Sequence, residues 1–139
     1  MKILIRNSDN VVIFAQDDLI LDTEVHGNDW RDPNFDITNS TIVEATVPDV
    51  WAGSIWSYAD GIWTVLDQTG YNETLQRHKD KTAIVVRQDR DKKLVASDWT
   101  QVADAPVDKA AWATYRQGLR DISTQAEFPL TVVWPTQPE

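Results

Sequence analysis

The first part of the chain alternates short apolar runs with clusters of turn-forming residues, a pattern typical of antiparallel β structure. Ile3–Ile5 and Val11–Phe14 flank Asn7–Asn10, and this arrangement predicts a hairpin. Leu19–Leu21 is apolar again and predicts a further strand. Residues 26–40 are rich in Gly, Asn, Asp and Pro, so they are expected to form a long loop. The two bulky aromatic residues of this loop are expected to attach it to the body.

A second β-forming block follows. Thr41–Val47 predicts a strand, and Ile55–Tyr58 and Ile62–Leu66 predict two more. Between the last two lies Asp60-Gly61, and an Asp-Gly step between aromatic-rich runs is a strong hairpin signal. Residues 1–67 are therefore expected to form a small antiparallel β domain.

The pattern then changes to one that favours a helix. Residues 72–97 contain no glycine or proline, their charges are dense, and their apolar residues are sparse. This predicts an exposed connecting helix, placed at residues 68–97. The β-branched run Ile84–Val86 favours a strand locally, so helix and strand both stay open at residues 82–87.

A shorter helix is predicted at about residues 108–122. Asp108 is a plausible N-cap, and Val107 and Trp112 occupy the positions of a hydrophobic staple. Apolar residues then recur at steps of three, four and three, which places them on one face of a helix. This stripe consists of Trp112, Tyr115, Leu119 and Ile122.

After this helix, an extended tail is predicted at residues 128–135. The expected fold class is therefore α+β: a small antiparallel β domain at the N-terminus, a long connecting helix, and a C-terminal region. That region, residues 98–139, combines the short helix with the extended tail.

Charge and composition exclude several kinds of partner. The formal net charge is −9: residues 1–70 hold twelve acids and three bases, residues 71–97 four and seven, and residues 98–139 six and three. The acidic N-terminal body repels phosphate backbones, so no nucleic-acid partner is expected, and the basic middle is expected to be a solvated helix face. No apolar run approaches the roughly 18 residues of a membrane helix, and no signal peptide is recognised, so we expect a cytosolic protein without a membrane partner.

No motif for a metal or a cofactor is present. The chain has no cysteine, and its two histidines, His26 and His78, lie in different predicted segments. The five glycines are isolated, so no phosphate-binding loop or nucleophile elbow occurs. We therefore expect no metal, no cofactor and no catalytic residues.

Paired carboxylates are the one catalytic alternative, because a glycosidase needs two of them. The candidates lie in predicted turns and loops, where any acidic β protein carries such residues. They are Asp17, Asp18, Asp29, Asp32 and Asp60.

Seven tryptophans are the compositional outlier. Each can bury a large area and offers one N–H, which suits it to anchoring a contact. The cluster Trp51, Trp56, Tyr58 and Trp63 fits either a thin core or an exposed aromatic docking patch, and the sequence does not separate these interpretations.

The C-terminal stripe leaves a similar choice. Either it packs on the chain's own helix or β domain, or a second protein covers it. Arg116 and Arg120, four residues apart and beside the stripe, would then supply the contacts of an interface rim. The candidate partner-binding residues are Trp99, Trp112, Tyr115, Arg116, Leu119, Arg120, Phe128 and Trp134.

The segment from Arg90 to Pro135 also carries an ordered set of short motifs. The set comprises Arg90-Asp91, Leu94, Asp98-Trp99-Thr100-Gln101, Asp104-Ala105-Pro106, Trp112, Tyr115-Arg116, Leu119-Arg120-Asp121, Phe128-Pro129 and Trp134-Pro135. In order and spacing it resembles the C-terminal part of the phage tail fibre assembly proteins, also called phage tail assembly chaperones. This match covers about a third of the chain. The first 66 residues look like the N-terminal module of small phage tail-associated proteins, on vaguer grounds.

Two positions depart from the family pattern. Ser123 stands where the family usually has a proline, and Ala126-Glu127 replaces a Pro-Gly step before the phenylalanine. Both changes remove residues that favour a turn, so the path of residues 122–128 is in doubt. The motifs around this segment are intact.

The resemblance implies a protein without catalytic residues that binds the phage tail fibre protein at its C-terminal tip and assists folding or trimerisation. An association with the trimeric fibre, in the host cytoplasm during assembly, would follow. One alternative is a structural virion component, such as a fibre tip, cap or adhesin, that stays on the tail. The weaker alternative is a glycan-active enzyme.

Overall fold

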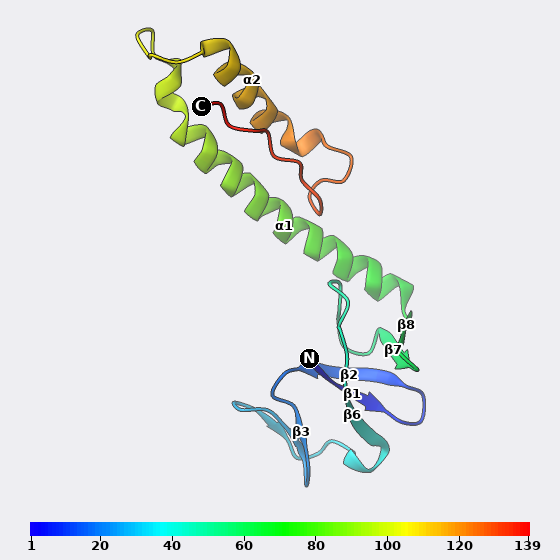
Figure 1. The fold of residues 1–139 in the computed structure, drawn as a ribbon. Coiled ribbons are helices and arrows are strands. Elements are labelled where there is room, and N and C mark those ends of the chain that lie inside the picture. The colour runs from blue at the N-terminus through cyan, green and yellow to red at the C-terminus, as the bar shows by residue number, and fades with distance from the viewer. The chain divides into compact units, whose positions relative to one another are not determined.

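The chain divides into two units, described here from a computed structural model of residues 1–139 (Figure 1). Unit 1 comprises Met1–Leu75 and is mostly antiparallel β structure, whereas unit 2 comprises Gln76–Glu139 and is mostly helical. The expected α+β fold class, with an antiparallel β region followed by a long and a short helix, is confirmed.

A five-stranded antiparallel sheet forms the body of unit 1. Both predicted hairpins are present, with the strands that the apolar runs indicate. The order across the sheet is β6-β1-β2-β7-β8. The strands are β1 (Lys2–Arg6), β2 (Val11–Gln16), β6 (Ser40–Glu44), β7 (Trp56–Ala59) and β8 (Ile62–Val65).

The sheet has two apolar faces, and a β-bulge in β2 distributes the residues of this strand between them. Leu4 pairs with Phe14 and Ile5 pairs with Val12, so Ile13 is the extra residue of β2. The bulge puts Val12 and Phe14 into different cores, although their spacing of two would place them on one face of a regular strand. One core is built on Ile3, Ile5 and Val12, and the other on Leu4, Leu19 and Val25.

A second, three-stranded sheet corrects the prediction of a long loop at residues 26–40. Its strands, β3 (Ile20–Leu21), β4 (Val25–His26) and β5 (Arg31–Asp32), have two residues each, and the 3-10 helix η1 (Ile37–Asn39) follows. Strands this short leave no alternation in the sequence. The aromatic residues of the segment do attach it to the body, because the rings of Trp30 and Phe35 lie 5.1 and 6.1 Å from that of Phe14.

The aromatic residues of β7 and β8 belong largely to the fold. Tyr58 pairs with Trp63 across the hairpin, with their rings 4.9 Å apart. Trp56 is buried and makes edge contacts with Trp63 and with Tyr71 at 6.0 and 5.6 Å. Trp51, Tyr58 and Trp63 are half-buried against the core of Ile3, Ile5 and Val12. The core interpretation of this cluster therefore holds for Trp56.

A charged contact closes the first hairpin. Arg6 donates to Asp9 from Nε and Nη2, at 2.9 and 2.7 Å, and Asp9 also accepts a hydrogen bond from the backbone N–H of Val11. The hydrogen bond from Arg6 is the main reason that the pKa of the Asp9 carboxyl lies below its ordinary value. The ionised carboxylate thus helps to order the turn.

The long helix α1 (Gln68–Ala96) is continuous, which decides for helix at residues 82–87. The 3-10 helix η2 (Asp98–Gln101) follows it, and then come α2 (Lys109–Arg120) and the 3-10 helix η3 (Asp121–Thr124). None of the helices combines the length with the apolar character needed to cross a bilayer.

The end of the chain differs in detail from the predicted extended tail at residues 128–135. Residues 126–130 form turns, and the Phe128–Pro129 peptide bond is cis. Residues 132–139 have no regular secondary structure. We call residues 132–139 the C-terminal tail. In unit 2 it runs between α1 and α2 (Figure 1).

The turn between β7 and β8 generates a stability prediction. Asp60 and Gly61 both have positive φ angles, 51° and 82°, as a tight hairpin turn requires. A Cβ added at Gly61 would meet no atom within 4 Å, so a substitution there tests the backbone alone. We expect Gly61→Ala to lower the free energy of unfolding by about 1–2 kcal/mol in urea titrations. Asp60→Asn is the control and should change it little, because asparagine tolerates this conformation.

Candidate partner-binding surface

The short helix α2 begins as its sequence predicts. The Asp108 carboxylate accepts hydrogen bonds from the backbone N–H groups of Ala110 and Ala111, at 3.0 and 3.1 Å, and so caps the first turn. Val107 packs against the core that includes Trp112, as a hydrophobic staple requires. Lys109 donates to the carbonyl oxygens of Val102 and Ala103 and ties the preceding loop to the helix. Local chemistry therefore fixes where α2 starts.

The apolar stripe of α2, which Ile122 continues into η3, is the core of unit 2. Trp112 and Tyr115 are each 5% exposed, and Leu119 and Ile122 are fully buried. The rings of Trp112 and Tyr115 meet edge to face, with their centroids 5.7 Å apart. Half-buried residues from α1, from the loop before α2 and from the end of the chain complete the cluster: Val86, Leu94, Val107, Phe128, Val132 and Trp134.

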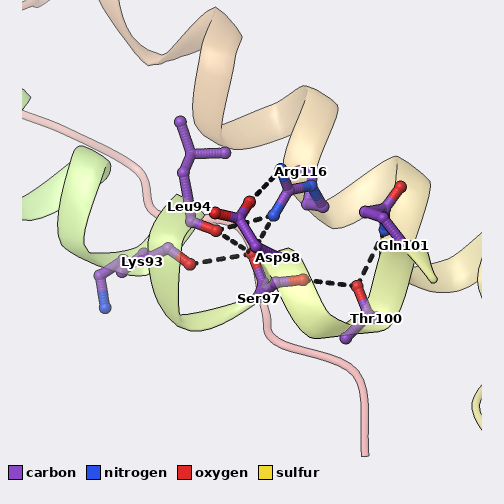
Figure 2. A network of polar contacts seen from close by, with 7 residues as sticks. All are labelled: Lys93, Leu94, Ser97, Asp98, Thr100, Gln101 and Arg116. Atoms are coloured by element: carbon purple, nitrogen blue, oxygen red, sulfur yellow. Dashed lines mark hydrogen bonds and ion pairs between the residues drawn. The ribbon is translucent and has the colours of Figure 1, made fainter. Parts of the chain in front are cut away.

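Arg116 connects α2 to the C-terminal end of α1 (Figure 2). Its Nη1 donates to the Leu94 carbonyl oxygen and to Ser97 Oγ, both at 2.7 Å. Its Nη2 donates to Asp98 Oδ1 at 2.8 Å and forms an ion pair there. A cation is favourable at this place, because the last carbonyl groups of a helix are unpaired and carry partial negative charge. We call these contacts the Arg116 network.

The Asp-Trp-Thr-Gln motif forms the turn that ends α1. Ser97 Oγ lies 2.9 Å from the carbonyl oxygens of both Lys93 and Leu94, and Thr100 Oγ1 donates to the Ser97 carbonyl oxygen at 2.7 Å. Gln101 in turn donates to Thr100 Oγ1 at 2.8 Å (Figure 2). Ser97 and Thr100 are buried. The motif therefore caps a helix and supplies the acceptor for Arg116.

Two cations lie over aromatic rings from the end of the chain. The Arg87 guanidinium carbon is 5.3 Å from the ring centroid of Phe128, and Lys93 Nζ is 5.3 Å from that of Trp134. Both cations come from α1 and both rings from the end of the chain, so the two segments run in the same direction.

A pocket of about 360 Å³ opens beside the end of α1. Trp99, Trp112 and Tyr115 line one part of it, and Lys93 and the last three residues of the chain line another. Trp99 is 52% exposed, and its ring lies 6.0 Å from that of Trp112. An exposed tryptophan at the mouth of an apolar pocket is suited to anchoring a protein partner.

The structure distributes the eight candidate partner-binding residues over three environments. Trp112, Tyr115, Arg116 and Leu119 are buried inside unit 2, and Phe128 and Trp134 are half-buried against α1; only Trp99 and Arg120 are exposed. Of the buried four, Trp112 and Tyr115 also line the pocket. Arg116 is buried by contacts with residues that lie 18 to 22 positions earlier in the chain.

The sequence pattern missed other parts of this surface. Lys93 and the last three residues line the pocket, and Val95 and Val102 near Trp99 are more than half exposed. No periodicity marks these positions, because they lie at a helix end, in a loop and in an irregular segment.

Four of the five acidic residues considered for catalysis have structural roles in unit 1. Asp18 accepts a hydrogen bond from the Asn28 N–H at 2.8 Å, and Asp32 accepts one from the Asn34 N–H at 3.1 Å. Asp17 pairs with the N-terminal ammonium group, and Asp60 forms the β7–β8 turn. No group of three or more His, Cys, Asp or Glu residues is placed to hold a metal ion.

Comparisons with known proteins support the resemblance seen in the sequence. Residues 83–139, less than half of the chain, match the family described as phage tail assembly chaperone protein, and this match supports the suspected family for this part of the chain. No curated protein and no solved structure matches the chain. The matched residues lie within unit 2, so they include the Arg116 network, the pocket and the C-terminal tail.

The Arg116 network generates a second prediction. We expect Arg116→Lys to lower the free energy of unfolding by about 1–3 kcal/mol, because one ammonium group cannot reach three acceptors as the guanidinium does, and a buried acceptor then loses its donor. Asp98→Asn keeps an acceptor oxygen at a side chain that is 62% exposed, so its cost should be about 1 kcal/mol or less. Urea titration followed by far-UV circular dichroism measures both. Equal losses would contradict this assignment of the buried contacts.

Proposed function

We propose that this chain is a phage tail assembly chaperone that binds the tail fibre protein at its C-terminal tip and assists its folding and trimerisation. The observation that carries the proposal is the family match over residues 83–139, which falls on the unit with the exposed Trp99 and its pocket. A chaperone of this family acts by binding, and none of the acidic residues considered for catalysis is needed for that role.

The physical task of such a chaperone suits this surface. Subunits of a β-rich trimer expose apolar surface and unpaired strand edges before their chains close, and these features cause aggregation. A partner that covers them must present apolar anchors and remain soluble itself. Trp99 beside the pocket supplies an anchor, and partner contacts of this kind centre on tryptophan, tyrosine and arginine.

The charge distribution supports a division of roles between the two units. Residues 1–75 hold thirteen acids and three bases, a net charge of −10, whereas residues 76–139 hold nine acids and ten bases, a net charge of +1. A strongly acidic unit keeps a protein soluble and disfavours self-association. Unit 2 is nearly neutral and can cover an apolar client without strong repulsion. We therefore propose that the client binds unit 2, and the proposed role puts this binding in the host cytoplasm during assembly.

Co-expression with the fibre protein of the phage tests the proposal. We expect the chain to raise the yield of soluble fibre trimer and to co-purify with the fibre. Trp99→Ala should reduce both effects at least about tenfold, as the loss of an interface anchor does. Ile62→Ala is the matched control, because Ile62 is 66% exposed but belongs to unit 1. The proposal is wrong if the fibre yield is the same with and without the chain and no complex forms.

A comparison of two tryptophans separates binding from folding. Trp112→Ala should lower the free energy of unfolding by about 3–5 kcal/mol, because it empties a large volume in the core of unit 2. Trp99→Ala should cost about 1 kcal/mol, the worth of its ring contact with Trp112. Thermal and urea unfolding of the two variants check this. A greater loss for Trp99→Ala would place Trp99 in the core.

A further inference from the structure

The C-terminal tail lies in unit 2 like a bound peptide. Residues 132–139 have no helix or strand of their own, and they run between α1 and α2 (Figure 1). We call the surface of the two helices that they contact, which includes the apolar stripe, Lys93 and Gly118, the groove. Val132 and Trp134 pack on the apolar stripe of α2, and the last three residues reach the pocket beside Trp99. A segment of the chain thus covers apolar surface that would otherwise be open.

Few polar contacts hold this segment. The side-chain amide of Gln125 donates to the Val133 carbonyl oxygen and accepts from the Val133 N–H, both at 2.8 Å, as a neighbouring β-strand would. No other backbone hydrogen bond ties residues 132–139 to the rest of unit 2. Side-chain packing provides the rest of the attachment. A segment held in this way is exchanged more easily than one held by a ladder of backbone hydrogen bonds.

Two features of the groove select the residues that it holds. A Cβ added at Gly118 would lie 3.1 Å from Cβ and 3.3 Å from Cγ of Pro135, so the missing side chain of α2 makes room for the proline ring. Next to it, Lys93 covers the ring of Trp134. The groove therefore accepts an aromatic residue followed by proline, in an extended backbone.

The tail does not fill the groove. The pocket of about 360 Å³ remains beside its last three residues. Trp99, Trp112 and Tyr115 line this pocket, so a bound segment that enters it can contact aromatic surface that the tail leaves uncovered.

We propose that the groove between α1 and α2 is the peptide-binding site of this chain, and that the C-terminal tail is an exchangeable occupant displaced by the client. The inference rests on the proposed function. The occupant is an extended segment of the fibre protein with an aromatic residue followed by proline, and without positive charge where it meets Lys93. The tail then keeps the apolar stripe covered until a client arrives.

The covalent connection of the tail to the chain determines how strongly the tail competes with a client for the groove. A short flexible connection gives an attached segment an effective concentration in the millimolar range. A client must therefore bind the groove more tightly than the tail does, and removing the tail must strengthen the binding of any peptide supplied from solution.

Peptide exchange tests the proposal without the fibre protein. The probe is a fluorescent synthetic peptide with the sequence of residues 129–139, PLTVVWPTQPE. We expect it to bind a chain that ends at Thr131 at least about tenfold more tightly than the full chain. A full chain with Trp134→Ala keeps the tail but weakens its packing, so it should bind the probe with intermediate affinity. That variant serves if the shortened chain does not fold.

Gly118→Ala in the shortened chain is the matched control. Alanine favours the helix by about 1 kcal/mol over glycine, so α2 should be at least as stable, while the added Cβ obstructs the proline ring. We expect about tenfold weaker probe binding, or a greater loss, from this one methyl group. A general apolar surface would bind both forms alike. Equal affinity of the full and shortened chains, or no effect of Gly118→Ala, overturns the proposal.

Competition with the fibre protein then identifies the occupant. Fibre protein added to the shortened chain should release the labelled probe. If the full chain captures the fibre but the fibre does not release the probe from the shortened chain, the groove proposal fails and the proposed function stands. If light scattering shows that full chains dimerise and that the dimer is lost with Trp134→Ala, a second copy is the occupant and the client proposal fails.

Discussion

The side chains of α1 cover only part of the apolar stripe of α2. The arrangement of unit 2 follows from this. Only two large apolar side chains of α1, Val86 and Leu94, pack against the stripe. Other apolar residues of α1, such as Ile84 and Val95, are more than half exposed. Two helices with so small a contact are marginal, because the free energy of burial must exceed the entropy lost on ordering. The end of the chain therefore returns between them with Phe128, Val132 and Trp134.

The Arg116 network fixes where the two helices meet. Apolar packing is not directional, so it sets the distance between α1 and α2 more than their register. Arg116 adds direction, because its planar guanidinium needs the Leu94 carbonyl, Ser97 Oγ and the Asp98 carboxylate in fixed positions. The same register shapes the groove for the tail. A polar contact at a helix end thus determines the geometry of an apolar site.

The sequence predicts those features whose causes are local. Both hairpins of unit 1 and the capped start of α2 follow from turn residues, alternation and the Asp108 cap, and the structure confirms them. The bulge at Ile13 and the two-residue strands could not be predicted, because neighbours far along the chain determine them. The helical spacing likewise predicts an apolar face on α2. It does not tell what covers that face, which here is the chain's own tail.

The same limit explains why Arg116 and Trp99 could not be told apart as binding residues. Both lie beside apolar positions in the sequence, yet one is buried by contacts with residues 18 to 22 positions away and the other is half exposed. Several motif residues behind the family resemblance, among them Thr100, Tyr115 and Leu119, are buried in unit 2. They therefore specify a scaffold that consists of the two helices, the Arg116 network and the C-terminal tail packed between the helices. Under the proposed peptide exchange, selection among clients would fall to the residues that border the groove, namely Trp99, Lys93 and Gly118. The family match then concerns the scaffold, and it leaves the identity of the bound segment to these border residues.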